Sequence, residues 1–188
     1  MVVAMGTLIA PTLAAPTTDL NALAKYFPAS APVLVSLRTD DAYIKEIDDL
    51  FAKIAAQIPG MKQPDTIAGQ FDNVVAEVVG SGDFASEVRS WLGNEASIGL
   101  FTFEGMMGRG DSNSGKPPHF LAAVSITDQK AAEAFWQAAL NKSTKGNYQS
   151  ATEGDFIIFT PDKSSSASGI VAIGKDVLFI GAYEEDIP

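Results

Sequence analysis

The sequence predicts an α+β fold, in which a mainly antiparallel sheet carries amphipathic helices on one face. Strand-like segments follow one another closely enough to pair as hairpins, whereas most helical segments come in one block. A doubly wound parallel sheet would instead alternate strand and helix along the whole chain. With 188 residues, of which 46% are hydrophobic and 19% charged, the chain is long enough for one domain with a sizeable core.

Three segments are expected along the chain. Residues 1–15 contain no charge and end in small residues, so they resemble a secretory signal peptide, although the usual basic start is missing. Residues 16–32 form a Pro- and Ala-rich lead-in with one helical turn around 20–26. The α+β domain occupies 33–188. We therefore expect an exported protein of the periplasm, a lumen or the cell surface, and a retained leader would offer membrane association.

The first strand leads directly into the first helix. Val33 to Leu37 contain four apolar residues in five, with β-branched Val33 and Val35, which predicts a buried strand. Thr39-Asp40 supplies an N-cap for the helix that follows. Apolar residues recur at helical spacing over 42–58, with charged residues on the opposite face, and Pro59-Gly60 ends this helix.

Two more helices complete the helical block. The apolar pattern over 67–78 predicts the second. The pattern over 84–92 predicts a shorter third helix, closed by Gly93.

The second half of the chain is rich in strands. The strands are expected over 96–103, 119–126, 148–152, 156–160, 169–173 and 177–182. A fourth helix, capped by Thr127-Asp128, carries an apolar stripe over 132–140. The segments VSLRTD (35–40) and VSITD (124–128) are alike, which suggests two weakly similar strand–helix units. The acidic residues at 184–186 resemble the first turn of another helix, so we expect the domain to continue beyond this chain.

Composition argues against several classes of function. The chain has 23 acidic and 13 basic residues, and its net charge of −10 would repel a nucleic-acid backbone. With no cysteine there is no disulfide, thiol nucleophile or thiolate metal site. His119 is the single histidine, and its place before an apolar run favours a strand-edge role. No cofactor and no metal is expected.

Residues 105–118 contain two short motifs. Gly110 to Lys116 resembles a phosphate-binding loop, but Pro117 stands where a hydroxyl is needed, and a strand follows instead of a helix. Arg109-Gly110-Asp111 resembles an adhesion tripeptide, which carries little information by itself. We expect a surface loop that is mobile or makes partner contacts. Its candidate contact residues are Met106, Met107, Arg109, Asp111 and Lys116.

Paired carboxylates do not predict a catalytic site. Asp40 and Asp41, like Asp48 and Asp49, are adjacent on one helix and point in different directions. We interpret Asp40 as a cap and Asp48 and Asp49 as solvated helix surface. The sequence therefore predicts no enzyme.

Four segments resemble a known protein family. They are FPASAPVLVSL (27–37), SWLGNEASIGLF (90–101), FLAAVSITDQKAAEAFWQAAL (120–140) and GIVAIGKDVLFIGAYEED (169–186). They resemble bacterial exported or membrane-anchored proteins that are catalogued only as a domain of unknown function and are common in cyanobacteria and Chloroflexus-like phyla. The resemblance supplies no catalytic residues, and it implies that this chain is the N-terminal part of a longer protein.

Two functions stay open from the sequence. The first is a non-enzymatic extracytoplasmic accessory protein that acts through protein–protein contacts, for example in an envelope or photosynthetic-membrane assembly. The second is a small-molecule or lipid-binding module with a pocket between helices and sheet. That pocket would be lined by Phe51, Phe71, Trp91 and Trp136, although both tryptophans also fit a packed core.

Overall fold

A computed structural model of the chain describes residues 22–58, 66–80, 82–102, 119–162 and 169–188. The strands are β1 (Val33–Arg38), β2 (Leu92–Leu100), β3 (Phe120–Ile126), β4 (Tyr148–Glu153), β5 (Phe156–Pro161), β6 (Ile170–Ile173) and β7 (Val177–Gly181). The α-helices are α1 (Asp41–Gln57), α2 (Ile67–Val79), α3 (Phe84–Glu87) and α4 (Gln129–Thr144), and the 3-10 helices are η1 (Ala24–Tyr26) and η2 (Glu184–Asp186).

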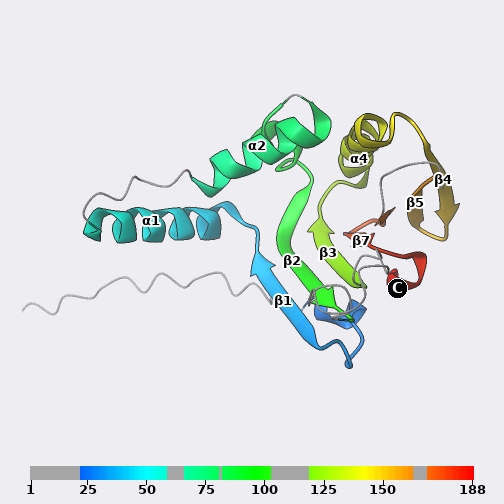
Figure 1. Cartoon of the computed structure of the whole chain (residues 1–188), viewed down its shortest axis with the longest axis horizontal. Coiled ribbons are helices and arrows are strands. Elements are labelled where there is room, and N and C mark those ends of the chain that lie inside the picture. Colours follow the sequence, from blue (N-terminus) through cyan, green and yellow to red (C-terminus); the bar gives the residue numbers. More distant parts are fainter. Residues whose placement is uncertain (1–21, 59–65, 81, 103–118, 163–168) are drawn as a thin grey trace, which may run out of the picture.

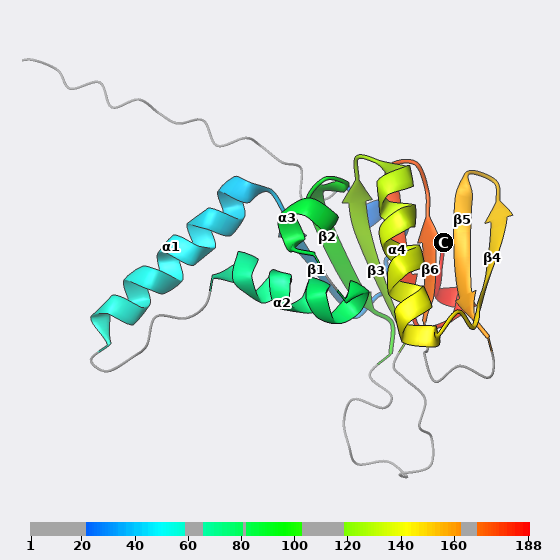
Figure 2. The ribbon, with the colours of Figure 1, turned by 90° about the horizontal axis from the view of Figure 1, so that it is seen from above.

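The seven strands form one sheet in the order β1-β2-β3-β7-β6-β5-β4, and every neighbouring pair is antiparallel. Helices α2, α3 and α4 lie over the same face of this sheet (Figures 1 and 2). The predicted α+β class is thus confirmed. β1 and β3 run in the same direction because both pair antiparallel with β2. Each leads into a helix with an aspartate N-cap: Asp40 caps α1 and Asp128 caps α4.

Helix α1 is placed differently from the other helices. It leaves the end of β1 and extends outward, away from the remaining strands (Figures 1 and 2). Its C-terminal half therefore exposes a stripe of large apolar side chains at helical spacing. These are Leu50, Phe51, Ile54 and the capping residue Ile58, with exposed fractions between 43% and 52%.

The opposite face of the sheet is covered by part of the lead-in. Leu23 and Phe27, which flank η1, are buried with Leu121 and Phe179 of the sheet in one apolar cluster. The ring of Phe27 lies so close to Gly99 in β2 that a Cβ at Gly99 would stand 2.5 Å from its Cδ1 atom. A glycine at this position therefore allows the N-terminal segment to seat on the sheet.

The third helix is shorter than predicted. It ends at Glu87, and Gly93 lies inside β2, so the prediction of a helix continuing to Leu92 and closed by Gly93 is wrong. A Cβ at Gly93 would come within 2.4 Å of Ser125 Oγ, so the glycine permits a close approach of β2 and β3 where their register shifts. There Ser125 Oγ accepts from the backbone N–H of Glu95 and donates to its carbonyl, at 2.9 Å each.

Replacement of Gly99 by alanine is expected to lower the free energy of unfolding by about 1–3 kcal/mol, because the new methyl group overlaps the Phe27 ring. Urea unfolding measures this loss. In a Phe27→Ala background the same substitution should cost much less, because the ring is gone. If Gly99→Ala lowered the free energy of unfolding equally in both backgrounds, the contact with Phe27 would not explain why a glycine is needed at position 99.

Candidate ligand-binding site

An apolar cavity of about 580 Å³ lies between the sheet and the helices. Its floor is a row of side chains that face the helices from four neighbouring strands. Leu37 pairs with Ala96, Ala96 with Val124 and Val124 with Leu178, so the antiparallel register itself places these residues side by side.

The walls of the cavity come from helices α1, α2 and α4. Two residues of the first half of α1, Ile44 and Ile47, face it. Phe84 of α3 and the following Val88 and Trp91 also face it, and the stripe of α2 with two aromatic residues of α4 adds the largest group. These residues are Ile67, Phe71, Val74, Val75, Val78, Phe135 and Trp136. Their three- and four-residue spacing is the amphipathic pattern that turns one helix face inward.

The cavity reaches the surface. Leu37, Phe71 and Val74 line it, yet they are 51%, 41% and 54% exposed. A ligand could therefore enter beside β1 and α2 without unfolding the domain.

Polar groups around the cavity are few. Arg38, Thr39 and Tyr43 contribute at the junction of β1 and α1, and Trp136 contributes from α4. The indole Nε1 of Trp136 is buried and has no hydrogen-bond partner among the described residues. A buried N–H without a partner costs about 1–3 kcal/mol, and because this atom has almost no accessible surface, the cavity does not expose it to a ligand.

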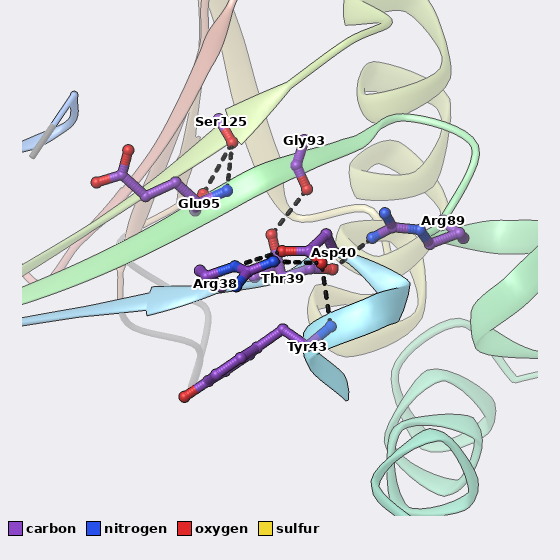
Figure 3. A network of polar contacts seen from close by, with 8 residues as sticks. All are labelled: Arg38, Thr39, Asp40, Tyr43, Arg89, Gly93, Glu95 and Ser125. Atoms are coloured by element: carbon purple, nitrogen blue, oxygen red, sulfur yellow. Dashed lines mark hydrogen bonds and ion pairs between the residues drawn. The ribbon is translucent and has the colours of Figure 1, made fainter. Parts of the chain in front are cut away.

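The junction of β1 and α1 is held by charged hydrogen bonds (Figure 3). Arg38 Nε and Nη2 donate to the two carboxylate oxygens of Asp40, at 2.8 and 2.9 Å. The same carboxylate caps α1 by accepting from the backbone N–H of Tyr43 at 3.0 Å. Burial alone would raise the pKa of Asp40, but the hydrogen bonds from Arg38 and Tyr43 outweigh it and hold the pKa below its usual value.

A second set of contacts ties this junction to β2 and α3. Thr39 Oγ1 donates to the carbonyl of Gly93 at 2.7 Å, and Arg89 Nη1 donates to the carbonyl of Thr39 at 2.6 Å (Figure 3). Arg89 Nε also pairs with Asp41 at 3.0 Å. The start of α1 is thus fixed over the cavity from both sides.

Helices α1 and α2 are also linked by an aspartate. Asp48 Oδ1 accepts from the backbone N–H of Ile67, the first residue of α2, at 2.7 Å. The interpretation of Asp48 as solvated helix surface is therefore wrong, because its carboxylate binds the backbone of a residue 19 positions later in the chain. Asp49 does lie on the exposed side, where it pairs with Lys45.

The structure brings together three of the four residues that the sequence placed around a pocket. Phe71, Trp91 and Trp136 line the cavity, whereas Phe51 lies on the exposed half of α1. Trp91 is at the same time a core residue, 4% exposed, and its Nε1 donates to the carbonyl of Glu87 at 2.7 Å. The candidate contact residues Met106, Met107, Arg109, Asp111 and Lys116 lie outside the described residues.

Two polar clusters that the sequence did not predict lie away from the cavity. In one, Asp186 bonds to His119 Nδ1 at 2.9 Å and accepts from the backbone N–H of Tyr183 at 3.0 Å, which fixes η2 beside the start of β3. In the other, the buried carboxylate of Glu95 accepts from the backbone N–H of Leu23 at 3.3 Å. Glu95 thereby holds the N-terminal segment on the face opposite the cavity. Over the described ranges, no cluster of three or more acidic or histidine side chains could hold a metal ion.

Comparison with known proteins gives a family but no activity. A family model described as "Protein of unknown function (DUF3352)" matches residues 1–184. The chain belongs to this family. No curated protein and no solved structure matches it. In the part of the chain that the structure describes, no helix is long and apolar enough to span a membrane.

Asp40→Ala is expected to destabilise the protein by about 1 kcal/mol at neutral pH, because α1 loses its cap and Arg38 loses its partner. The pKa of Asp40 is lower in the folded state, so its contribution is full above the ordinary value of 3.8 and is lost as the pH falls through the folded value. Urea unfolding as a function of pH should therefore show the two proteins converging in acid.

Asp49→Ala is the matched control for this prediction, since Asp49 forms an exposed pair on the same helix. If Asp49→Ala lowered the free energy of unfolding as much as Asp40→Ala does, the junction of β1 and α1 would have no special role in stability.

Proposed function

We propose that this protein is a non-enzymatic binding module that holds an apolar small molecule, such as the acyl chain of a lipid, between its sheet and its helices. The cavity carries this proposal. Its volume of about 580 Å³ lies within the range of about 300–1,000 Å³ that ligand sites occupy. The space is open to solvent beside Leu37, Phe71 and Val74, and its lining is almost wholly apolar, so covering that lining with an apolar ligand is favourable.

The lining indicates the chemistry of the ligand. Nearly every side chain around the cavity is aliphatic or aromatic, so the body of the ligand must be apolar. Arg38 is already neutralised by Asp40, so an anionic group on the ligand is not required.

The acidic groups near the cavity support a role without catalysis. Asp40 caps α1, and Asp48 binds the first N–H of α2, so both carboxylates are engaged in holding helices. General acid–base chemistry would instead need such a group within hydrogen-bond reach of a substrate proton.

A second candidate is the accessory role through protein–protein contacts outside the cytoplasm. Exposed large apolar residues on α1, α2 and β1 support it, because contiguous apolar surface usually marks a contact site. The uncharged segment 1–15 supports export.

Export can be tested on the native protein. Cell fractionation and mass spectrometry of the N-terminus should find it outside the cytoplasm, either cut near residue 15 or retained with its leader. A cytoplasmic protein that begins at Met1 would contradict this location.

Ligand binding is testable with a fluorescent polyene fatty acid. The chain has two tryptophans, and both line the cavity, so binding should quench their emission by energy transfer. Ala96→Phe places a ring on the cavity floor and is expected to weaken the affinity about tenfold or more, equivalent to about 1.4 kcal/mol. The matched control is Ala134→Phe, on the exposed side of α4, which should bind like the unmodified protein.

Urea unfolding of both variants checks that they are folded. No saturable quenching by the unmodified protein, or equal affinities for the two variants, would rule out the cavity as the site.

A further inference from the structure

We propose that two copies of this chain pair through β1, joining their sheets into one, and that α1 of each copy covers sheet residues that the other copy leaves exposed. This inference concerns the β1 edge, where Leu37 is shared with the mouth of the cavity, and it does not rest on ligand binding. Three features of the described residues support it: an open sheet edge, an overhanging helix and an uncovered strip of sheet.

The first feature is the edge strand itself. β1 ends the strand order, so one side of its backbone has no neighbour in the described sheet. The N–H of Thr39 bonds to the carbonyl of Asn94 in the direction of β2, and alternate residues of an antiparallel strand point to opposite sides. The backbone groups of Leu34 and Ser36 therefore point to the open side.

The side chains of β1 favour pairing instead of preventing it. Residues 33–37 carry no charge, and Leu34, Val35 and Leu37 are 40%, 44% and 51% exposed. β1 ends in Arg38, which Asp40 neutralises, whereas the other edge strand, β4, has the polar sequence YQSATE and ends in a glutamate. Natural sheets protect their edges with charged and polar residues, so β4 resembles a protected edge and β1 an edge that is used.

The second feature is the helix that overhangs this edge. Beyond its first turns, α1 extends past β1, and no strand of its own sheet lies beyond that edge (Figures 1 and 2). Its exposed residues Leu50, Phe51 and Ile54 continue the stripe whose first members, Ile44 and Ile47, face the cavity. One amphipathic helix is thus half covered and half bare, as expected if more sheet belongs beneath it.

The third feature is a strip of sheet that none of the described helices covers. Val35 and Ile98 are paired across β1 and β2, two residues from Leu37 and Ala96 on the cavity floor. Because alternate residues share a face, they point to the helix side of the sheet. They are nevertheless 44% and 42% exposed.

A two-fold axis perpendicular to the sheet satisfies all three features together. Such an axis at Val35 pairs the two β1 strands antiparallel and keeps the helices of both copies on the same side. It places Leu34 opposite Ser36 of the second copy, so their outward backbone groups can bond. Each α1 then extends over β1 and β2 of the other copy, where Val35 and Ile98 are bare.

The apolar contact area reaches at most the lower end of the range for a specific dimer. The eight exposed apolar side chains on α1, β1 and β2 leave between 40% and 52% of their surface accessible. Together they would bury roughly 600 Å² per copy, and the strand backbones add to this, against about 800 Å² per partner in an interface of standard size. The net charge of −10 opposes association, so the dimer should tighten as salt rises.

Cysteine cross-linking tests the register. The chain has no cysteine, so single-cysteine variants are clean probes. At Val35 the two copies would form a non-hydrogen-bonded pair with Cα atoms about 4.5 Å apart, within the range for a disulfide. Mild oxidation of Val35→Cys is expected to give covalent dimers, and Ser150→Cys, on the β4 edge, should give none, because its cysteines lie far from the axis.

Sedimentation equilibrium tests the association without a cross-link. The unmodified chain should dimerise, and Val35→Lys should weaken the dimer by about two orders of magnitude, because two lysines meet on the axis. Ser150→Lys on β4 is the control, and circular dichroism checks that both variants fold. A chain that stays monomeric at high salt, a dimer unaffected by Val35→Lys, or equal cross-linking at the two cysteines would each overturn the proposal.

Discussion

The paired charges of Arg38 and Asp40 fix the point at which α1 leaves the sheet, and most functional features of this protein depend on that point. Asp40 holds the first turn of α1 through the N–H of Tyr43, while Arg89 and Thr39 tie the junction to α3 and β2. Two further contacts of α1 within the described residues are the bond from Ile67 to Asp48 and the ion pair of Arg89 with Asp41. The direction set by this junction carries α1 beyond the sheet edge (Figure 2), while Ile44 and Ile47 of its first half line the cavity.

The two faces of the sheet are covered unequally. On one face, Leu23 and Phe27 pack closely, Gly99 makes room for the Phe27 ring, and the buried Glu95 binds the backbone N–H of Leu23. On the other face, the helices reach over the sheet without filling the space beneath them. Apolar surface that its own chain does not cover is costly in water, so an occupant lowers the free energy. The cavity and the β1 edge are two separate outcomes of this incomplete cover.

Helical periodicity located most of the cavity lining but not all of it. Phe71 and Trp136 lie on predicted apolar stripes and do face the cavity, and Trp91 reaches it from the turn before β2. Phe51 lies on an equally clear stripe and faces solvent. A stripe shows which residues share a face of a helix, but not whether the sheet extends beneath the whole helix. The same limit hid the role of Asp48, because its partner belongs to another helix.

The sequence by itself determined the α+β class, most strand and helix positions and the caps at Asp40 and Asp128, because apolar periodicity and capping are local. Only the tertiary structure decided the strand order, the place of Gly93 within β2 and the bonds that join Glu95 to Leu23 and Asp186 to His119. Each of these features depends on contacts between residues distant in sequence, and a local sequence pattern does not predict such contacts. The cavity belongs to the same class, since strand register and helix direction together create it.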